Sequence, residues 1–446
     1  MVHIDMRQGF KSIKAHIKPI FFLEGYSYES AERIVKNFME ELRETYNDEI
    51  ILDPLILRND LDFRTIMDDV EPYADVIILP MVGRRYNYRK VRLLNKPVVL
   101  WQDKGFSHAA SWDSRGFLKK WGVNVFTPMG PVEHRKTIQV ISAVNSLKKS
   151  KMIVFGRIPP PNVASQWSLE EIEKKIGVEI KNIGLEAVLQ RSEEIEASVV
   201  EKTLREWENF FENFDKDRLE EVARLYISIK EVLDREAANS FTINCLEDLF
   251  SRKFVPPCIA LARFIDEGIV AGCEADINVA LSMMILSYVS RGPSIMGNIY
   301  LFRPWPGPGF PPVETRIEDI RKSLKDNIVR LTHDVIPLTM CTKSRWHLED
   351  YHNKGEGNTA YAPLKVGDNV TLLRISPNLE EMLVIKGKIL KVEDTIHCRF
   401  SAWIKVDNAR KIADKAYAFH HAMIYGDWSS ELEIFGKLTG IKVEIV

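Results

Sequence analysis

Short apolar runs alternate with amphipathic stretches through the first 150 residues, and this alternation limits the possible folds more than any other feature of the chain. Between the first two runs, apolar residues recur at helical spacing from Ile34 to Leu42, which predicts a helix with one apolar stripe. A strand, a helix and a second strand form a βαβ unit, whose strands are parallel. Repetition of this unit predicts an open, doubly wound parallel sheet. Its predicted strands are residues 19–23, 50–52, 76–79, 98–101 and 123–126.

Several classes of ligand are disfavoured by what the chain lacks. No Gly-x-Gly-x-x-Gly run opens a predicted helix, so neither dinucleotide binding nor a nucleotide-dependent transferase is supported. The 61 basic and 63 acidic side chains nearly cancel, so no strong field attracts nucleic acid or an anionic membrane. The N-terminus lacks a secretory signal pattern, and no apolar run reaches transmembrane length. We therefore expect a cytoplasmic protein that binds a small or neutral ligand.

Two further domains are predicted after the first. Residues 152–155 predict a new buried strand, and Ser168 with Glu171 has the capping-box pattern that marks the start of a helix. Residues 304–312 are too rich in proline and glycine for a helix or a central strand, so they predict a loop between domains.

The composition beyond this loop favours β-structure. Alternating or β-branched runs predict antiparallel strands at residues 369–375, 382–392 and 398–406. The whole chain is therefore predicted to have an α/β fold. Two doubly wound, Rossmann-like domains, residues 1–150 and 151–312, are followed by a β-rich C-terminal domain, residues 313–446.

Two carboxylates, Glu274 and Asp276, interrupt an otherwise small and apolar segment at residues 266–281. A buried acid is costly unless it is paired or bound to a cation. Because the two acids are two positions apart, only one is expected to face a given ligand. The alternative is structural: both are helix-start acids favoured by the helix dipole.

This segment carries a family resemblance. Residues 272–277, followed by Ala280 and Leu281, resemble the Glu-Gly-Asp signature of L-fucose and L-arabinose isomerases, in which the glutamate binds the catalytic metal. Further likenesses occur in the same order along the chain. They are residues 155–157 with Trp167 and residues 176–178, His333 within residues 331–337, and the double-histidine segment at residues 419–426.

The resemblance implies a divalent metal, usually Mn²⁺, held by a glutamate, a second acidic residue and a histidine, with sugar oxygens completing the shell. Mixed oxygen and nitrogen ligands suit such an ion. Glu274 takes the glutamate position, and His421 aligns with the histidine ligand. His420 is then expected beside the substrate. The resemblance also implies a homo-oligomer, a trimer or a hexamer.

The second acidic position of the family falls on Asn298 in this chain. An amide oxygen still binds a metal, but it cannot accept a proton as a carboxylate does. The acid/base pair of the family is therefore incomplete unless Asp276, His333 or another subunit supplies the missing group. The alternative is that Asn298 only shapes a loop.

The remaining candidates have weaker local signals. His333 is expected to be a metal ligand or a proton shuttle, with a core histidine as the alternative. Arg157 and Trp167 are expected to line the sugar site, although packing accounts for both equally well. These assignments predict an aldose–ketose isomerase that acts on a free pentose, hexose or deoxy sugar through an enediol. The alternative is a metal- and sugar-binding receptor or regulator of the same fold that has lost catalysis.

Overall fold

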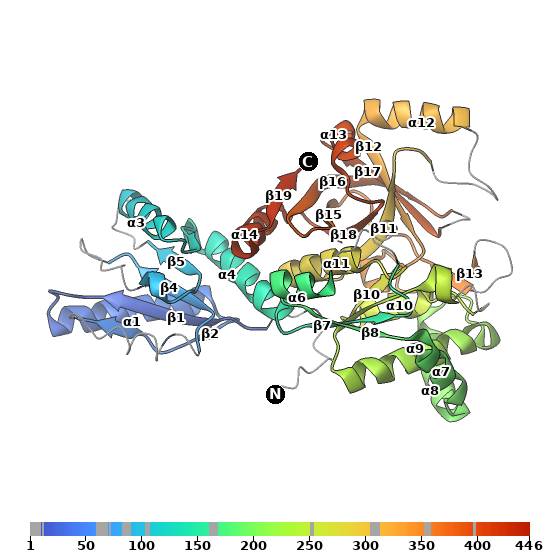
Figure 1. Cartoon of the computed structure of the whole chain (residues 1–446), viewed down its shortest axis with the longest axis horizontal. Coiled ribbons are helices and arrows are strands. Elements are labelled where there is room, and N and C mark those ends of the chain that lie inside the picture. The colour runs from blue at the N-terminus through green and yellow to red at the C-terminus, as the bar shows by residue number, and fades with distance from the viewer. Residues whose placement is uncertain are drawn as a thin grey trace. The chain divides into compact units, whose positions relative to one another are not determined.

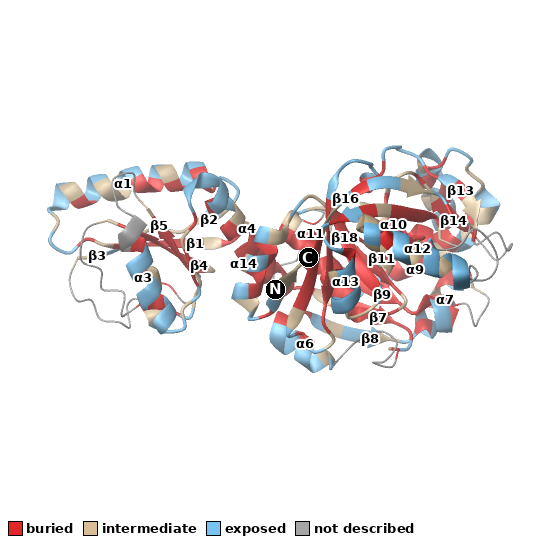
Figure 2. Ribbon diagram, turned by 90° about the horizontal axis from the view of Figure 1, so that it is seen from above, coloured by how far each residue is buried: buried red, intermediate tan, exposed pale blue. Residues whose placement is uncertain are grey.

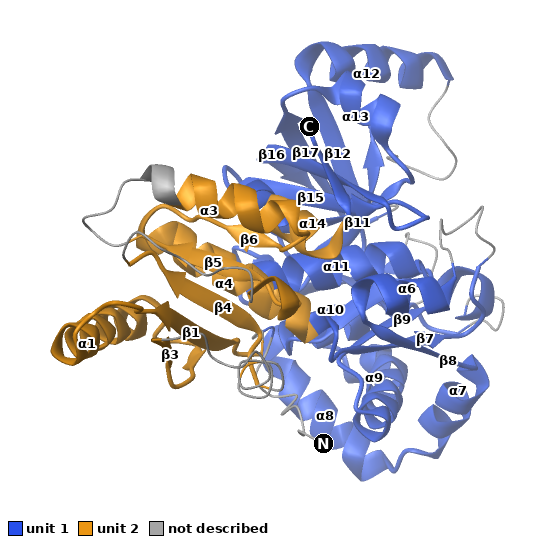
Figure 3. Cartoon of the chain, turned by 60° about the vertical axis from the view of Figure 1, so that its left-hand side comes forward, with its two compact units in different colours: residues 1–11, 147–432, 441–446 blue, residues 12–146, 433–440 orange. Residues whose placement is uncertain are grey.

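A computed structural model describes residues 13–58, 73–82, 91–102, 108–159, 168–249, 254–303, 313–351, 358–395 and 398–446, with Phe10 and Val70. The chain divides into two compact units (Figure 3). The first consists of Leu147–Leu432 with Met1–Lys11 and Ile441–Val446, and the second of Ser12–Ser146 with Glu433–Gly440. Among the described helices, none has the length and apolar character needed to cross a membrane.

The unit that contains residues 12–146 is an open parallel sheet, as the alternating pattern predicted. Its strands are β1 (His16–Phe22), β2 (Ile50–Ile51), β4 (Val76–Pro80), β5 (Val98–Trp101) and β6 (Val125–Phe126), in the order β2-β1-β4-β5-β6. A short additional strand, β3 (Leu55–Leu57), also pairs in parallel with β1. The accompanying helices are α1 (Tyr28–Thr45), α3 (His108–Lys120) and α4 (Gly130–Leu147).

Alternate residues of the sheet belong to two separate hydrophobic cores, one on each face. On β1, Ile17 and Phe21 pack into the core that includes α1, whereas Ile20 packs into the other core. Residues 433–440 from the chain's last helix also belong to this unit, and Ile434 and Leu438 pack against the first core. Burial on both faces explains why the strands read as continuous apolar runs.

A buried histidine makes this unit sensitive to acid. The Nδ1 atom of His134 lies 2.8 Å from the Tyr46 hydroxyl, and its ring centroid lies 4.0 Å from that of Trp101. Burial lowers the pKa of His134 from 6.5 to about 4. Between these two pH values the unfolded chain binds more protons than the folded chain, so stability falls as the pH drops through this window.

We expect this one group to account for a loss of about 3 kcal/mol in unfolding free energy between pH 6.5 and pH 4. Urea unfolding of the wild type and of His134→Gln across this pH range measures it, because the variant lacks the titrating ring. Parallel pH dependences for the two proteins contradict the prediction.

The larger unit begins with a second parallel sheet. Its order is β10-β9-β7-β8, formed by β10 (Val270–Cys273), β9 (Ser240–Ile243), β7 (Lys151–Phe155) and β8 (Glu179–Ile183). Ser168 caps α6 and accepts a hydrogen bond from the Glu171 backbone N–H, which confirms the predicted helix start. The helices of this layer are α6 (Leu169–Ile176), α7 (Leu185–Glu194), α8 (Ala197–Trp207), α9 (Lys216–Glu236), α10 (Cys258–Asp266) and α11 (Ile277–Ser290).

The C-terminal part of this unit is a closed antiparallel barrel (Figure 1). The strands follow the order β15-β18-β11-β12-β17-β16, and pairing between β15 and β16 closes the ring. Their bounds are β11 (Ile295–Tyr300), β12 (Ile328–His333), β15 (Asn369–Ile375), β16 (Glu381–Glu393), β17 (Phe400–Val406) and β18 (His420–Tyr425). Strand β19 (Lys442–Ile445) adds to β16 in parallel.

The remaining elements of the unit lie between or after the barrel strands along the sequence. They are α12 (Val313–Asp326), β13 (His347–Asp350), β14 (Asn358–Tyr361) and α13 (Ala409–Lys415), and the last helix, α14 (Ser429–Thr439), begins in this unit and continues into the other. The strands β15, β16 and β17 confirm the three antiparallel strands predicted from residues 369 to 406. Strand β11, which the predicted division assigns to the second domain, pairs with β12 and β18 of the barrel.

Helix α11 connects the two layers of the larger unit. It contacts β10 of the parallel sheet and β15 and β18 of the barrel. Its residues are buried on every side except at its last position (Figure 2), which explains why this helix is apolar all round. The N-terminus of α11 therefore brings the end of a parallel strand to the barrel, and both predicted acids lie at this point.

Candidate metal centre

Glu274 lies in the turn between β10 and α11. Both Glu274 and Ala275 have left-handed backbone conformations, with φ of 59° and 50°. Such conformations are unfavourable for residues with a side chain and are typical of functional sites. The next residue, Asp276, is the N-cap of α11 and accepts a hydrogen bond from the Val279 N–H at 3.1 Å. The turn thus places two carboxylates at the carboxyl end of a parallel strand.

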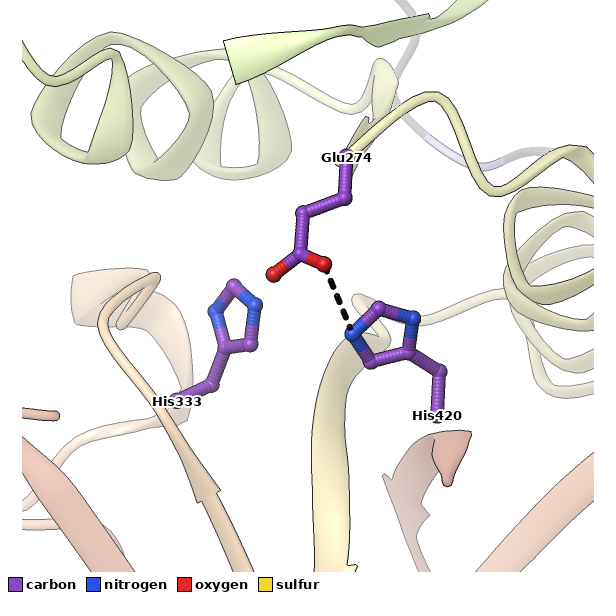
Figure 4. A group of neighbouring side chains, drawn as sticks. All are labelled: Glu274, His333 and His420. Carbon is purple, nitrogen blue, oxygen red and sulfur yellow. Dashed lines mark ion pairs between the residues drawn. The ribbon is translucent and has the colours of Figure 1, made fainter. Parts of the chain in front are cut away.

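Two histidines from the barrel meet the Glu274 carboxylate (Figure 4). His333 is the last residue of β12, and His420 is the first residue of β18. One potential ligand atom from each of Glu274, His333 and His420 lies within 4.8 Å of the other two. Figure 4 shows the carboxylate between the two imidazole rings.

Hydrogen bonds orient both rings. The Val335 backbone N–H donates to Nδ1 of His333 at 3.3 Å, and Nδ1 of His420 lies 3.0 Å from Oδ2 of Asp276. The other nitrogen of His420, Nε2, is buried and lies 3.6 Å from Oε2 of Glu274, and no described residue forms a hydrogen bond with it. This distance is too long for a hydrogen bond. It is close to the separation of two ligand atoms that share one cation through bonds of about 2.1 Å.

The electrostatics of the group favour ionised carboxylates. Burial alone would raise the pKa of Glu274, but the nearby His420 ring and the charge of His333 lower it below its ordinary value. Burial also opposes the ionisation of Asp276, yet Arg374 and His420 lower its pKa to about 2. Burial lowers the pKa of His333 and keeps its ring neutral. Burial opposes a charge on His420, but its hydrogen bond with Asp276 and the charges of both carboxylates raise its pKa. A metal binds neutral imidazole and ionised carboxylate, so an ion at this ring would displace a proton.

Asn298 lies next to this group on β11, between the two histidine-bearing strands. In the sheet it is the direct partner of His420 on β18 and of Thr332 on β12. Its Nδ2 donates to the Tyr300 hydroxyl at 3.2 Å, whereas its buried Oδ1 has no hydrogen-bond partner among the described residues. An amide oxygen on the strand beside His420 is a donor that could add to a mixed oxygen and nitrogen set.

His421, the predicted histidine ligand, lies directly after the histidine that the structure brings to Glu274. The group that the structure brings together contains His420, and His421 is not part of it. The two residues are adjacent on β18, and successive side chains of a strand point to opposite faces. Burial and then the positive charge of Arg374 lower the pKa of His421 to about 3. A metal-ligand role for His421 stays a prediction.

Of the two predicted sugar contacts, the structure describes only Arg157. Arg157 follows β7, and its backbone N–H and Nε donate to Asp248 at 2.6 and 2.7 Å. Its side chain remains 69% exposed. Trp167 lies outside the described residues. A sugar-binding role for either residue remains a prediction.

Sequence reasoning considered Asp276 only as a helix-start acid or a spare proton acceptor, and it did not foresee the contact with His420. The signal was present in part, because an acid at a helix start commonly caps the helix. The second contact joins residues 144 positions apart, and no local pattern indicates it.

Comparison with known proteins agrees with the geometry. The family model of the L-arabinose isomerase central domain matches residues 169–292, which include Glu274. The sulfoquinovose isomerases of Priestia aryabhattai and Priestia megaterium are each 23% identical over 330 residues, covering 70% of this chain and 67% of the relative. The sulfoquinovose isomerase of Alkalicoccus urumqiensis is 22% identical over 316 residues, covering 68% and 67%.

The fold, the carboxylate–imidazole group and these matches together define a sugar isomerase. These matches confirm the resemblance to L-fucose and L-arabinose isomerases seen in the motifs of the chain.

Proposed function

We propose that this isomerase interconverts an aldose and a ketose with one divalent metal ion, manganese being the first candidate, bound at the Glu274 group. The observation that carries the proposal is the buried pair of Glu274 and His420. Their facing atoms are 3.6 Å apart, and the imidazole Nε2 has no hydrogen-bond partner among the described residues. Buried polar atoms normally have a partner, so this arrangement supports a cation bound between the two groups.

The residues that would hold the ion are Glu274, His420 and the Oδ1 atom of Asn298. They supply a carboxylate oxygen, an imidazole nitrogen and an amide oxygen, a set that suits a first-row divalent metal. When bound, the metal supplies Lewis-acid stabilisation of the negative charge that develops on the sugar oxygens. The Arg374 guanidinium is engaged with Asp276 at 2.8 Å.

Isomerisation requires that one proton leaves C2 of the open-chain aldose and that a proton is returned to C1. Glu274 is the group in the cluster that accepts and returns this proton, since the amide of Asn298 cannot. A second proton moves from the C2 hydroxyl to the C1 oxygen. Because His333 accepts a hydrogen bond at Nδ1, its neutral ring carries the proton on Nε2. This tautomer favours His333 as a proton shuttle over a role as a ligand.

The substrate class is tested directly by product formation. The three relatives are named for sulfoquinovose, so this sugar belongs in the panel with pentoses, hexoses and 6-deoxy sugars. We expect one aldose to give its ketose when Mn²⁺ is present and none to react after the protein is treated with a chelator. Conversion at an unchanged rate after complete metal removal contradicts a role for the metal.

A metal- and sugar-binding receptor is the second candidate, and the observation that favours it is Asn298, whose amide cannot replace an acidic group. We expect the isomerase to incorporate deuterium beside the carbonyl when the reaction runs in D₂O with Mn²⁺, as measured by NMR. A receptor binds its sugar, by calorimetry, without exchange. Binding without any label therefore selects the second candidate.

We also propose that the protein is a homo-oligomer, a trimer or a hexamer. The support is the family resemblance. Light scattering of the purified protein measures the mass of the assembly.

A further inference from the structure

One carboxylate, that of Asp276, makes three contacts at the edge of the metal centre. Its Oδ1 accepts from the Val279 N–H at 3.1 Å and so caps α11. Its Oδ2 accepts from Nη1 of Arg374 at 2.8 Å and lies 3.0 Å from Nδ1 of His420. The side chains of Arg374, His420 and Asp276 are 0%, 2% and 4% exposed, so solvent does not compete for these contacts.

The contact with His420 decides which nitrogen of its ring carries the proton. An ionised carboxylate only accepts hydrogen bonds, so Nδ1 must be the donor. A neutral ring protonated at Nδ1 has its lone pair on Nε2, the atom that faces Glu274. Arg374 in turn keeps the acid ionised and its Oδ2 in place, because a buried carboxylate is stabilised by a paired guanidinium.

We propose that Asp276, held by Arg374, is a positioning residue that fixes His420 in the tautomer whose Nε2 lone pair faces Glu274. The inference rests on the proposed metal at this site. Because Asp276 also begins α11, the same side chain ties the ligand on the barrel to the helix that follows Glu274. Asp276 therefore helps to position both the His420 ring and the turn that carries Glu274.

The chemistry of asparagine makes Asp276→Asn an informative variant. Asparagine caps helices about as well as aspartate, so α11 need not be lost. If the amide oxygen keeps the cap, the amide NH₂ faces His420 and donates to Nδ1, which moves the ring proton to Nε2. If the amide turns over, the helix loses its cap. Either arrangement loses one of the two contacts that the carboxylate makes at the same time, the helix cap or the hydrogen bond from His420.

The experiment is a titration of the metal-free protein with Mn²⁺ alone, followed by calorimetry. We expect the Kd of Asp276→Asn to rise by about 10- to 100-fold, the usual effect of removing an outer partner of a ligating histidine. We expect saturating Mn²⁺ to restore much of kcat and to leave the sugar KM nearly unchanged. The matched control is Asp215→Asn, which alters the N-cap of α9, where the acid accepts from the N–H groups of Asp217 and Arg218 and has no histidine contact. Its Kd should equal that of the wild type.

The possible outcomes separate this inference from the proposed function. If the wild type itself binds no Mn²⁺, the proposed metal site fails. If the wild type binds and Asp276→Asn has the same Kd, the positioning role is overturned. Melting in the presence of a chelator shows whether Asp276→Asn is folded. If it is not, Arg374→Lys is measured instead, because it keeps the charge and loses the planar fork, and an unchanged Kd in this variant overturns the inference.

Discussion

Glu274→Gln is expected to lower kcat by about 10³-fold or more while the protein remains folded. Glutamine has nearly the same shape, so the left-handed turn and the start of α11 are retained. It cannot accept the C2 proton, and as a neutral group it binds a divalent cation more weakly than a carboxylate does. Initial rates of ketose formation with saturating Mn²⁺ and substrate measure the loss, and circular dichroism establishes that the variant is folded.

The matched control for this prediction is Glu231→Gln. Glu231 is a surface acid that pairs with Nε of Arg191 at 2.6 Å and is not part of the Glu274 group. Exposed ion pairs contribute little to stability, so this variant should have wild-type activity. If Glu274→Gln turns over substrate at the wild-type rate, the proposed mechanism is wrong, because the cluster contains no other carboxylate among the described residues.

The sequence was sufficient for the fold wherever burial on both faces left continuous apolar runs. The predicted strand at residues 98–101 has the bounds of β5, and the run at 76–79 differs from β4 by one residue. Closure of the barrel was not predictable in this way. It depends on pairing between β15 and β16 and on the inclusion of β11, and an apolar run does not indicate its partners.

The site was predictable to the extent that one local motif contains it. Glu274 stands out because an acid in an apolar segment requires a partner, and the family signature supplies the reason. The orientation of the histidines depends on the face of β18 that points toward Glu274. His420 and His421 are both buried, so no alternation of polar and apolar residues reveals that face. Arg374 and Asp276 are 98 residues apart, and only the fold brings them together.

Substitutions of His420 and His421 distinguish the ligand that the family motif indicates from the ligand that the structure indicates. We expect His420→Asn to weaken Mn²⁺ binding by more than about 100-fold, because the variant loses a ligand and not merely a partner of one. His421→Asn should bind Mn²⁺ within a few-fold of the wild type. Its main cost is to stability, about 1–3 kcal/mol, since it places a new polar group in the buried barrel wall.

Calorimetric titration of both metal-free variants with Mn²⁺ measures the difference, and thermal unfolding in a chelator shows how far each substitution weakens the fold itself. We expect His420→Asn to have the weaker affinity for Mn²⁺. We expect His421→Asn to have the larger loss of unfolding free energy in the absence of metal. If His421→Asn loses the metal and His420→Asn keeps it, the ligand is the residue that the family motif indicated. The carboxylate–imidazole pair at 3.6 Å would then be an ordinary buried ion pair, and the isomerase would need another centre.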